Sequence, residues 1–169
     1  VTEHLTYCLE TYGDGDISLL SKAVEHYYIH TRREMKEVMA GKGLIHMFRM
    51  PEDVKEFLIR AKEKNKKLGL VTSGLYEKAY PEIYAAFQMA KMGKPEEFYD
   101  CILTAGTLLE KGVAGTLGEL EAKPHPWMYA EALVNGFGMT VPEGKYVLAI
   151  EDSSSGICSA RLAGLCTIG

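Results

Sequence analysis

Two adjacent carboxylates, Glu151 and Asp152, follow an apolar run in the stretch AIEDSSSG. Like charges at the end of a buried strand repel each other, and a divalent cation would remove that cost. Glu and Asp oxygens are ligands that Mg²⁺ takes together with water and phosphate oxygens. The pair therefore indicates a Mg²⁺ site. The alternative is that Asp152, Ser153 or Ser154 only caps the helix beginning here, since Asp and Ser are preferred caps.

A second candidate is the stretch LVTSG, in which Thr72 and Ser73 stand at the end of an apolar run before Gly74. Hydroxyls beside a glycine let backbone N–H groups approach an anion at the start of a helix. Phosphate binding is therefore one interpretation of this stretch. The other is that a serine or threonine caps the following helix.

A third candidate is Lys123, which directly precedes Pro124 and is followed by Pro126 in KPHPWMYAEAL. The prolines stiffen the entry to a helix and place one ammonium group at its start. A lone lysine is usually a solvated surface residue, so this signal is weak when taken alone. A run containing Gly112, Gly115 and Gly118 lacks the Gly-Lys-Ser/Thr ending of a phosphate loop, and we interpret it as a loop.

Helices and strands alternate over most of the chain and must position these candidates. Apolar spacing predicts helices with one buried face in the region up to Met50 and a further helix from Pro51, whose buried stripe is Val54, Phe57, Leu58 and Ala61. Beyond this helix we expect a strand ending at Thr72, then a helix over 76–89, a strand over 101–104, a helix over 126–135, a strand over 146–150, a helix over 154–162 and a strand over 165–168. Crossovers of this length imply an α/β fold with a parallel sheet between helices. Ligands of such sheets bind at the carboxyl ends of the strands, where Thr72 and Glu151 stand.

Composition restricts the class of protein. The chain has 169 residues, 47% of them hydrophobic, and a net charge of −4, which gives no basic surface for nucleic acid or an anionic membrane. The cysteines Cys8, Cys101, Cys158 and Cys166 lack CxxC pairing, which is typical of reduced thiols. No apolar run approaches the ~20 residues of a membrane span. We expect a soluble, cytoplasmic monomer that binds neither nucleic acid nor membrane.

The order of hydroxyl, lysine and carboxylate pair, each at a successive strand-to-helix junction, resembles the haloacid dehalogenase (HAD) superfamily. Thr72 matches its second motif, Lys123 followed by Pro its third, and Glu151-Asp152 with a following Ser and Gly its fourth. The stretch EDSSSGICSARLAG is similar to the subgroup of β-phosphoglucomutase and phosphoglycolate phosphatase. The resemblance implies a Rossmann-like core over 51–169 and a small helical cap domain over 1–50.

The resemblance also implies roles for these residues. Thr72 and Lys123 would be catalytic, phosphate would bind to Thr72, Ser73, Gly74 and Lys123, and Glu151 and Asp152 would hold Mg²⁺. The implied activity is hydrolysis of a small phosphorylated metabolite through an aspartyl-phosphate. A sugar-phosphate mutase and a catalytically inactive, phosphate-binding relative are the alternatives.

The first motif of that superfamily, a strand followed by Asp-x-Asp-Gly-Thr that carries the nucleophile, has no match. Asp14-Gly15-Asp16 has no apolar strand before it and no Gly-Thr after it, and we interpret it as a polar turn before a helix. In the superfamily the missing strand lies between those ending at Thr72 and Ile150. We therefore expect a gap or a foreign strand at that position and a chain that is inactive by itself. We also expect either a nucleophile segment upstream of Val1 or a protein that has lost its catalytic activity.

Overall fold

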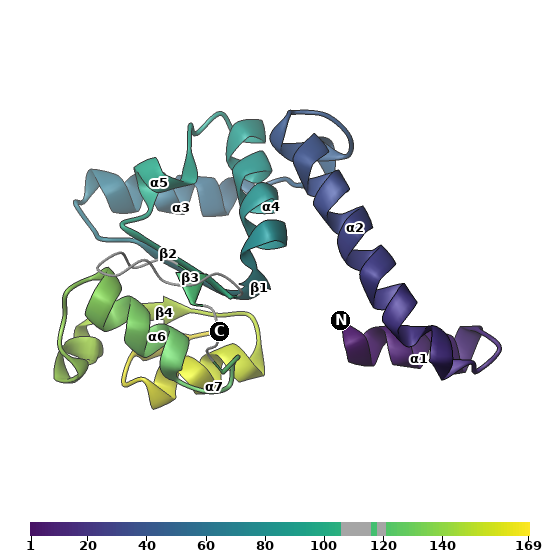
Figure 1. Ribbon diagram of the computed structural model, residues 1–169. Helices are drawn as coiled ribbons and strands as arrows, with labels where there is room; N and C mark the ends of the chain where they lie inside the picture. Colours follow the sequence, from purple (N-terminus) through teal and green to yellow (C-terminus); the bar gives the residue numbers. More distant parts are fainter. Residues whose placement is uncertain (106–115, 118–120) are drawn as a thin grey trace.

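The computed structural model describes residues 1–105, 116–117 and 121–169 of the chain. Helices α1 (Thr2–Tyr12) and α2 (Leu20–Met39) project to one side of a mixed α/β region, and α2 runs beside α4 (Tyr76–Met89) (Figure 1). The glycine run expected to form a loop lies outside the described residues. Among the described helices, none combines the length and the apolar character needed to cross a membrane.

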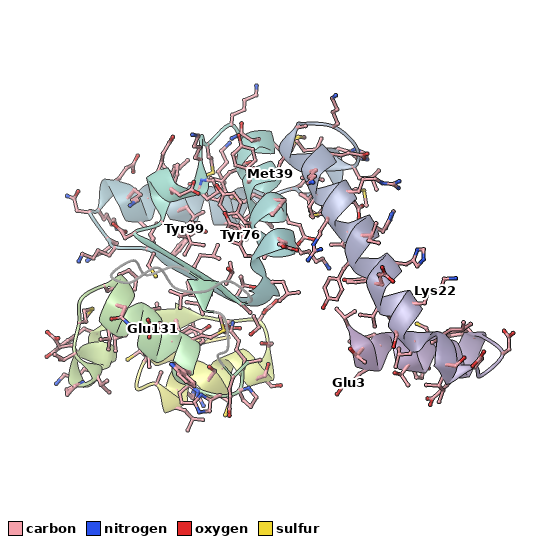
Figure 2. The ribbon with its side chains drawn as sticks, viewed as in Figure 1. Glu3, Lys22, Met39, Tyr76, Tyr99 and Glu131 are labelled. Carbon is pink, nitrogen blue, oxygen red and sulfur yellow. The ribbon has the colours of Figure 1, made fainter. Side chains whose placement is uncertain are left out.

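The N-terminal helices follow their apolar spacing. The apolar residues of α2 recur at steps of three and four residues, and this stripe gives the helix the one buried face expected: two of its members, Met35 and Val38, are buried with Ala85 of α4. Met39, labelled in Figure 2 at the end of α2, lines an open cavity together with Tyr80 and Tyr84 of α4. Asp16 accepts a hydrogen bond from the Ser18 N–H at 2.9 Å and begins a short 3-10 helix, Ile17–Leu19, that leads into α2. The polar turn predicted at this point is confirmed.

Strands β1 (Gly69–Leu75), β2 (Cys101–Ala105) and β3 (Thr116–Leu117) form one parallel sheet in the order β1-β2-β3. Helices α3 (Glu52–Glu63), α4 and α5 (Pro95–Phe98) lie on one side of it (Figure 1). Leu58 of α3 and Phe87 of α4 are the centre of the core on this side.

Strands β4 (Leu148–Ile150) and β5 (Cys166–Ile168) form a second parallel sheet. Ala149 packs against a buried cluster contributed by α6 (Trp127–Glu131), by the π-helical turn that follows it (Ala132–Gly136), and by α7 (Ser154–Leu162). A 3-10 helix, Val141–Tyr146, leads into β4. A further 3-10 turn, Ile45–Met47, precedes α3.

The two sheets are separate in the described part of the chain, because β1 pairs with β2 and β4 pairs with β5, but β1 does not pair with β4. The expected α/β fold with an interrupted sheet is confirmed. The interruption leaves apolar surface uncovered: Leu148, Ile150 and Ile168 share one face of the β4–β5 sheet, and each is more than half exposed.

Several details differ from the prediction. Val54 and Phe57 were predicted to be buried but are 41% and 49% exposed, because no described element packs over their side of α3. Strand β1 continues past Thr72 to Leu75 through an irregular register, and β4 begins only at Leu148. The division into a cap over 1–50 and a core over 51–169 stays a prediction.

Candidate active site

An open cavity of about 560 Å³ lies at the carboxyl end of β4 and beside Val71 and Thr72 of β1. At this point the regular pairing of β1 with β2 breaks off, and we refer to it as the end of β1. It is lined by Val71, Thr72, Lys123, Ile150, Glu151, Asp152 and Gly169. Residues far apart in the sequence reach it because parallel strands present their carboxyl ends at the same edge. The structure therefore brings together Thr72, Lys123 and the carboxylate pair, although β1 and β4 belong to different sheets.

Lys123 connects the two strand ends. Its Nζ forms a close ion pair with Glu151 Oε1, after β4, and donates to the Val71 carbonyl oxygen of β1 at 3.3 Å. The two side chains of the pair are only 13% and 7% exposed. Lys123 is therefore a largely buried, paired group and not a solvated surface residue.

Glu151 is surrounded by donors. Oε1 accepts from the Tyr129 hydroxyl as well as from Lys123, and Oε2 accepts from the Ser153 hydroxyl at 3.3 Å. Burial would raise the pKa of Glu151, but the hydrogen bonds from Lys123 and Tyr129 outweigh it and hold the pKa below its usual value. Glu151 is therefore an anion at neutral pH.

Asp152 differs from its neighbour because its side chain is exposed. Helix α7 is capped by Ser153, whose hydroxyl oxygen accepts the Gly156 N–H at 3.1 Å. Capping therefore occupies a serine and leaves both carboxylates to face the cavity. The cap and the acidic pair are separate features of the same short stretch.

Gly156 lets the Glu151 carboxylate lie close against helix α7. A methyl group at position 156 would overlap the Glu151 carboxylate, so a side chain there would displace that carboxylate from the first turn of α7. Together with the Ser153 cap, this close approach holds the charged group against the helix. The spacing of five residues between Glu151 and Gly156 was visible in the sequence, but its packing role was not.

At the end of β1, Thr72 Oγ1 accepts the Gly74 N–H at 3.1 Å, which leaves the hydroxyl proton free to point elsewhere. Ser73 Oγ lies 3.7 Å from Met128 Sδ. Neither hydroxyl caps α4, whose cap residue is Leu75. The Gly74 N–H already donates to Thr72 and is not directed at a ligand. The phosphate-binding roles of Ser73 and Gly74 stay predictions.

The donor chemistry at the end of β4 fits Mg²⁺ in part. Asp152 is exposed, and among the described residues Glu151 Oε2 has one long hydrogen bond, so oxygen atoms are available as metal ligands on both residues. In the described part of the chain, however, no group of three or more His, Cys, Asp or Glu side chains is placed to hold a metal. Further oxygens would have to come from water, phosphate or another carboxylate.

Tyr129 was missed by the sequence reasoning. It lies six residues after Lys123 on α6, it is buried, and its hydroxyl reaches Glu151. Burial and the hydrogen bond to Glu151 both raise its pKa. Only its place on the helix that directly follows the Lys123 turn could have indicated that it lies near the same site.

Comparison with known proteins supports the resemblance. The sequence model described as haloacid dehalogenase-like hydrolase matches residues 7–169. A β-phosphoglucomutase from Clostridium difficile superposes with a TM-score of 0.55 at 20% identity, covering 99% of this chain and 63% of that one. A HAD-superfamily hydrolase from Ehrlichia chaffeensis gives 0.45 at 21% identity, covering 67% and 49%. The chain thus spans 63% and 49% of the length of these two structures. No protein in the curated set matches its sequence.

Proposed function

Because the chain belongs to the haloacid dehalogenase-like hydrolase family, we propose that it provides the site of a Mg²⁺-dependent phosphohydrolase that acts on small phosphorylated metabolites through an aspartyl-phosphate. One observation supports this most: Thr72, Lys123, Glu151 and Asp152 line the same cavity at the strand ends. A hydroxyl, an ammonium and two carboxylates are the groups needed to bind and transfer a phosphoryl group.

In this proposal the described residues hold the phosphoryl group. The free hydroxyl proton of Thr72 donates to a phosphoryl oxygen, and the backbone of Ser73 and Gly74 lies beside it. Lys123 offsets negative charge on the nucleophile and on the transferring group together. The helical region over 1–50 acts as the cap that covers the substrate and excludes water.

Glu151 and Asp152 would hold the metal, with Asp152 as the principal ligand. When bound, Mg²⁺ supplies positive charge that offsets the charge of the phosphate. Glu151 has a second task, since it also holds Lys123 in place.

The nucleophile is the part that the described residues do not provide. Asp14 and Asp16 stand in the turn between α1 and α2, and neither ends a strand. We propose that an aspartate on an added strand enters between β1 and β4. Its carboxylate oxygen bonds to phosphorus while the bond to the leaving oxygen breaks, the leaving oxygen takes a proton, and water then hydrolyses the acyl phosphate.

The test is phosphate release from p-nitrophenyl phosphate and a panel of sugar phosphates in the presence of Mg²⁺. The chain is assayed alone and with a synthetic peptide of an apolar strand ending in Asp-Leu-Asp-Gly-Thr, whose retention is checked by gel filtration. We expect release only with the peptide, and none when its first Asp is Asn. Lys123→Ala and Asp152→Asn should lower the rate.

Three outcomes would argue against this proposal. No release by a chain that retains the peptide would favour the inactive, phosphate-binding relative. Transfer to a second hydroxyl of a sugar phosphate without net release would favour the mutase. Release by the chain alone would show that the nucleophile is already present.

A further inference from the structure

Tyr129 is a buried tyrosine whose hydroxyl bonds to a residue of the site. The residue is 7% exposed, and its hydroxyl donates to Oε1 of Glu151. Buried tyrosine hydroxyls usually find a partner, but here the partner is a charged carboxylate that lines the cavity. A hydrogen bond to a charged group is stronger than one between neutral groups.

The ring of Tyr129 makes a second contact. Lys123 Nζ lies over it, 5.1 Å from the ring centroid. The negative face of an aromatic ring attracts a cation, and the attraction grows when the pair is removed from water. One side chain therefore touches both members of the Lys123–Glu151 pair, the anion through its hydroxyl and the cation through its ring.

Tyr129 is itself held in place by packing. It belongs to the buried cluster with Leu133, Ala149, Ala160 and Ala163, so α6, β4 and α7 all contribute to its surroundings. A ring confined in this way can orient a neighbour, because its own rotamer is fixed by the core.

We propose that Tyr129 is a positioning residue of this site, holding the Lys123 ammonium and the Glu151 carboxylate together so that Lys123 is presented at the cavity in one orientation. This proposal rests on the proposed function only in one respect, the role of Lys123 in stabilising the charge of the phosphoryl group. The proposal also assigns different roles to the two carboxylates. Glu151 accepts hydrogen bonds from Tyr129 and Lys123, whereas Asp152 faces solvent.

The experiment measures how fast Lys123 is acylated by trace acetic anhydride at fixed pH, using mass spectrometry with the exposed Lys66 as internal reference. The main variant is Tyr129→Phe, which keeps the ring and removes the hydroxyl. The matched control is Tyr146→Phe, because Lys145 Nζ also lies over that ring at 5.0 Å while Tyr146 is 76% exposed.

Loss of the hydroxyl should raise Lys123 labelling about 3- to 10-fold, the range expected from losing the ordinary net contribution of one hydrogen bond that holds its partner Glu151. Tyr146→Phe should leave Lys145 and Lys123 labelling unchanged. Lys62, which contacts Asp100 at 3.4 Å, reports on general loosening and should not change in either variant. Tyr129→Leu, which removes the ring as well, should raise Lys123 labelling further.

Unchanged Lys123 labelling in Tyr129→Phe would overturn the proposal, and so would an equal rise at Lys62. Binding of Mg²⁺ and of orthophosphate is measured on the same samples by calorimetry. If neither binds even when the strand peptide of the phosphate-release test is present, while Lys123 labelling rises as expected, the proposed function fails and the positioning role of Tyr129 stands.

Discussion

The two strand ends that meet at the cavity are built in different ways. At the end of β4, Glu151 has donors from Lys123, Tyr129 and Ser153 and rests on Gly156. At the end of β1, the Thr72 hydroxyl accepts the Gly74 N–H of its own turn and makes no other hydrogen bond to the residues that the structure describes. The charged groups at the β4 end are already bonded to one another in the folded protein. The hydroxyl at the β1 end is available to a ligand.

This difference has a physical cause. A charge removed from water must be compensated within the protein, so Glu151 and Lys123 can be nearly buried only as a hydrogen-bonded pair. A hydroxyl carries no charge, so it needs no compensating partner before a ligand binds. We therefore expect substitutions at the β4 end to change stability and those at the β1 end to change ligand binding.

The largest effect should come from Glu151→Ala. Removing this carboxylate leaves the Lys123 ammonium largely buried without its partner, which typically costs about 3–5 kcal/mol in the free energy of unfolding. Urea unfolding followed by circular dichroism measures it. The double variant Lys123→Met with Glu151→Leu is the control, and it should recover most of the loss. A cost below about 1 kcal/mol for Glu151→Ala would mean that the pair is not buried in solution.

Gly156→Ala should be the next largest. Glycine to alanine within a helix normally stabilises a protein by up to about 1 kcal/mol, but here the methyl group would overlap the Glu151 carboxylate. We expect a loss of about 1–3 kcal/mol in the free energy of unfolding, as for overpacking in a core. Ser154→Ala, at an exposed position on the same turn, should change the stability little. A stabilising Gly156→Ala would show that Glu151 does not rest on α7.

The sequence predicted the regular elements well where local signals agree. The bounds of α4 and α7 match their predicted ranges, and the α2 stripe is turned inward as its spacing indicates. The acidic pair, Lys123 and Thr72 were found because charged and hydroxyl side chains at strand ends are conspicuous in an apolar sequence.

The remaining features depend on contacts between distant residues. Nothing local shows that Val54 and Phe57 would be left uncovered, since their spacing is that of a buried stripe. Tyr129 looks like an ordinary apolar residue of α6 until the fold brings Glu151 to its hydroxyl. The extension of β1 to Leu75 likewise arises from pairing with Ala105 of β2.

Thr72→Val examines the open half of the site. The change removes the hydroxyl and leaves the half-buried Gly74 N–H without its acceptor, which should cost only about 1 kcal/mol in the free energy of unfolding. Orthophosphate binding, measured by calorimetry, should weaken at least tenfold because the outward donor is lost. Thr72→Ser is the control and should retain both properties. A large stability loss with unchanged binding would reverse the contrast between the two strand ends.

The smallest effect concerns Asp100, which directly precedes β2 and lies beside the start of β1. Its Oδ2 accepts the Leu68 N–H at 2.8 Å and lies 3.4 Å from Lys62 Nζ. Burial would raise the pKa of Asp100, but the hydrogen bonds from Leu68 and Lys62 prevail and lower it. A carboxylate whose pKa is lower in the folded state stabilises the fold above its unfolded pKa, and this contribution disappears as the pH falls through the folded value.

Wild type should therefore be more stable than Asp100→Asn at pH 7, by less than about 1 kcal/mol because the Asp100 side chain is 37% exposed. The difference should shrink as the pH falls below the usual Asp range near 4, where the carboxyl becomes protonated. Urea unfolding at pH 7, 5 and 3 measures it, with Ser154→Ala as a variant whose effect should not depend on pH. A difference that grows toward pH 3 would contradict the lowered pKa. It would mean that the start of β1 is held by packing and not by this carboxylate.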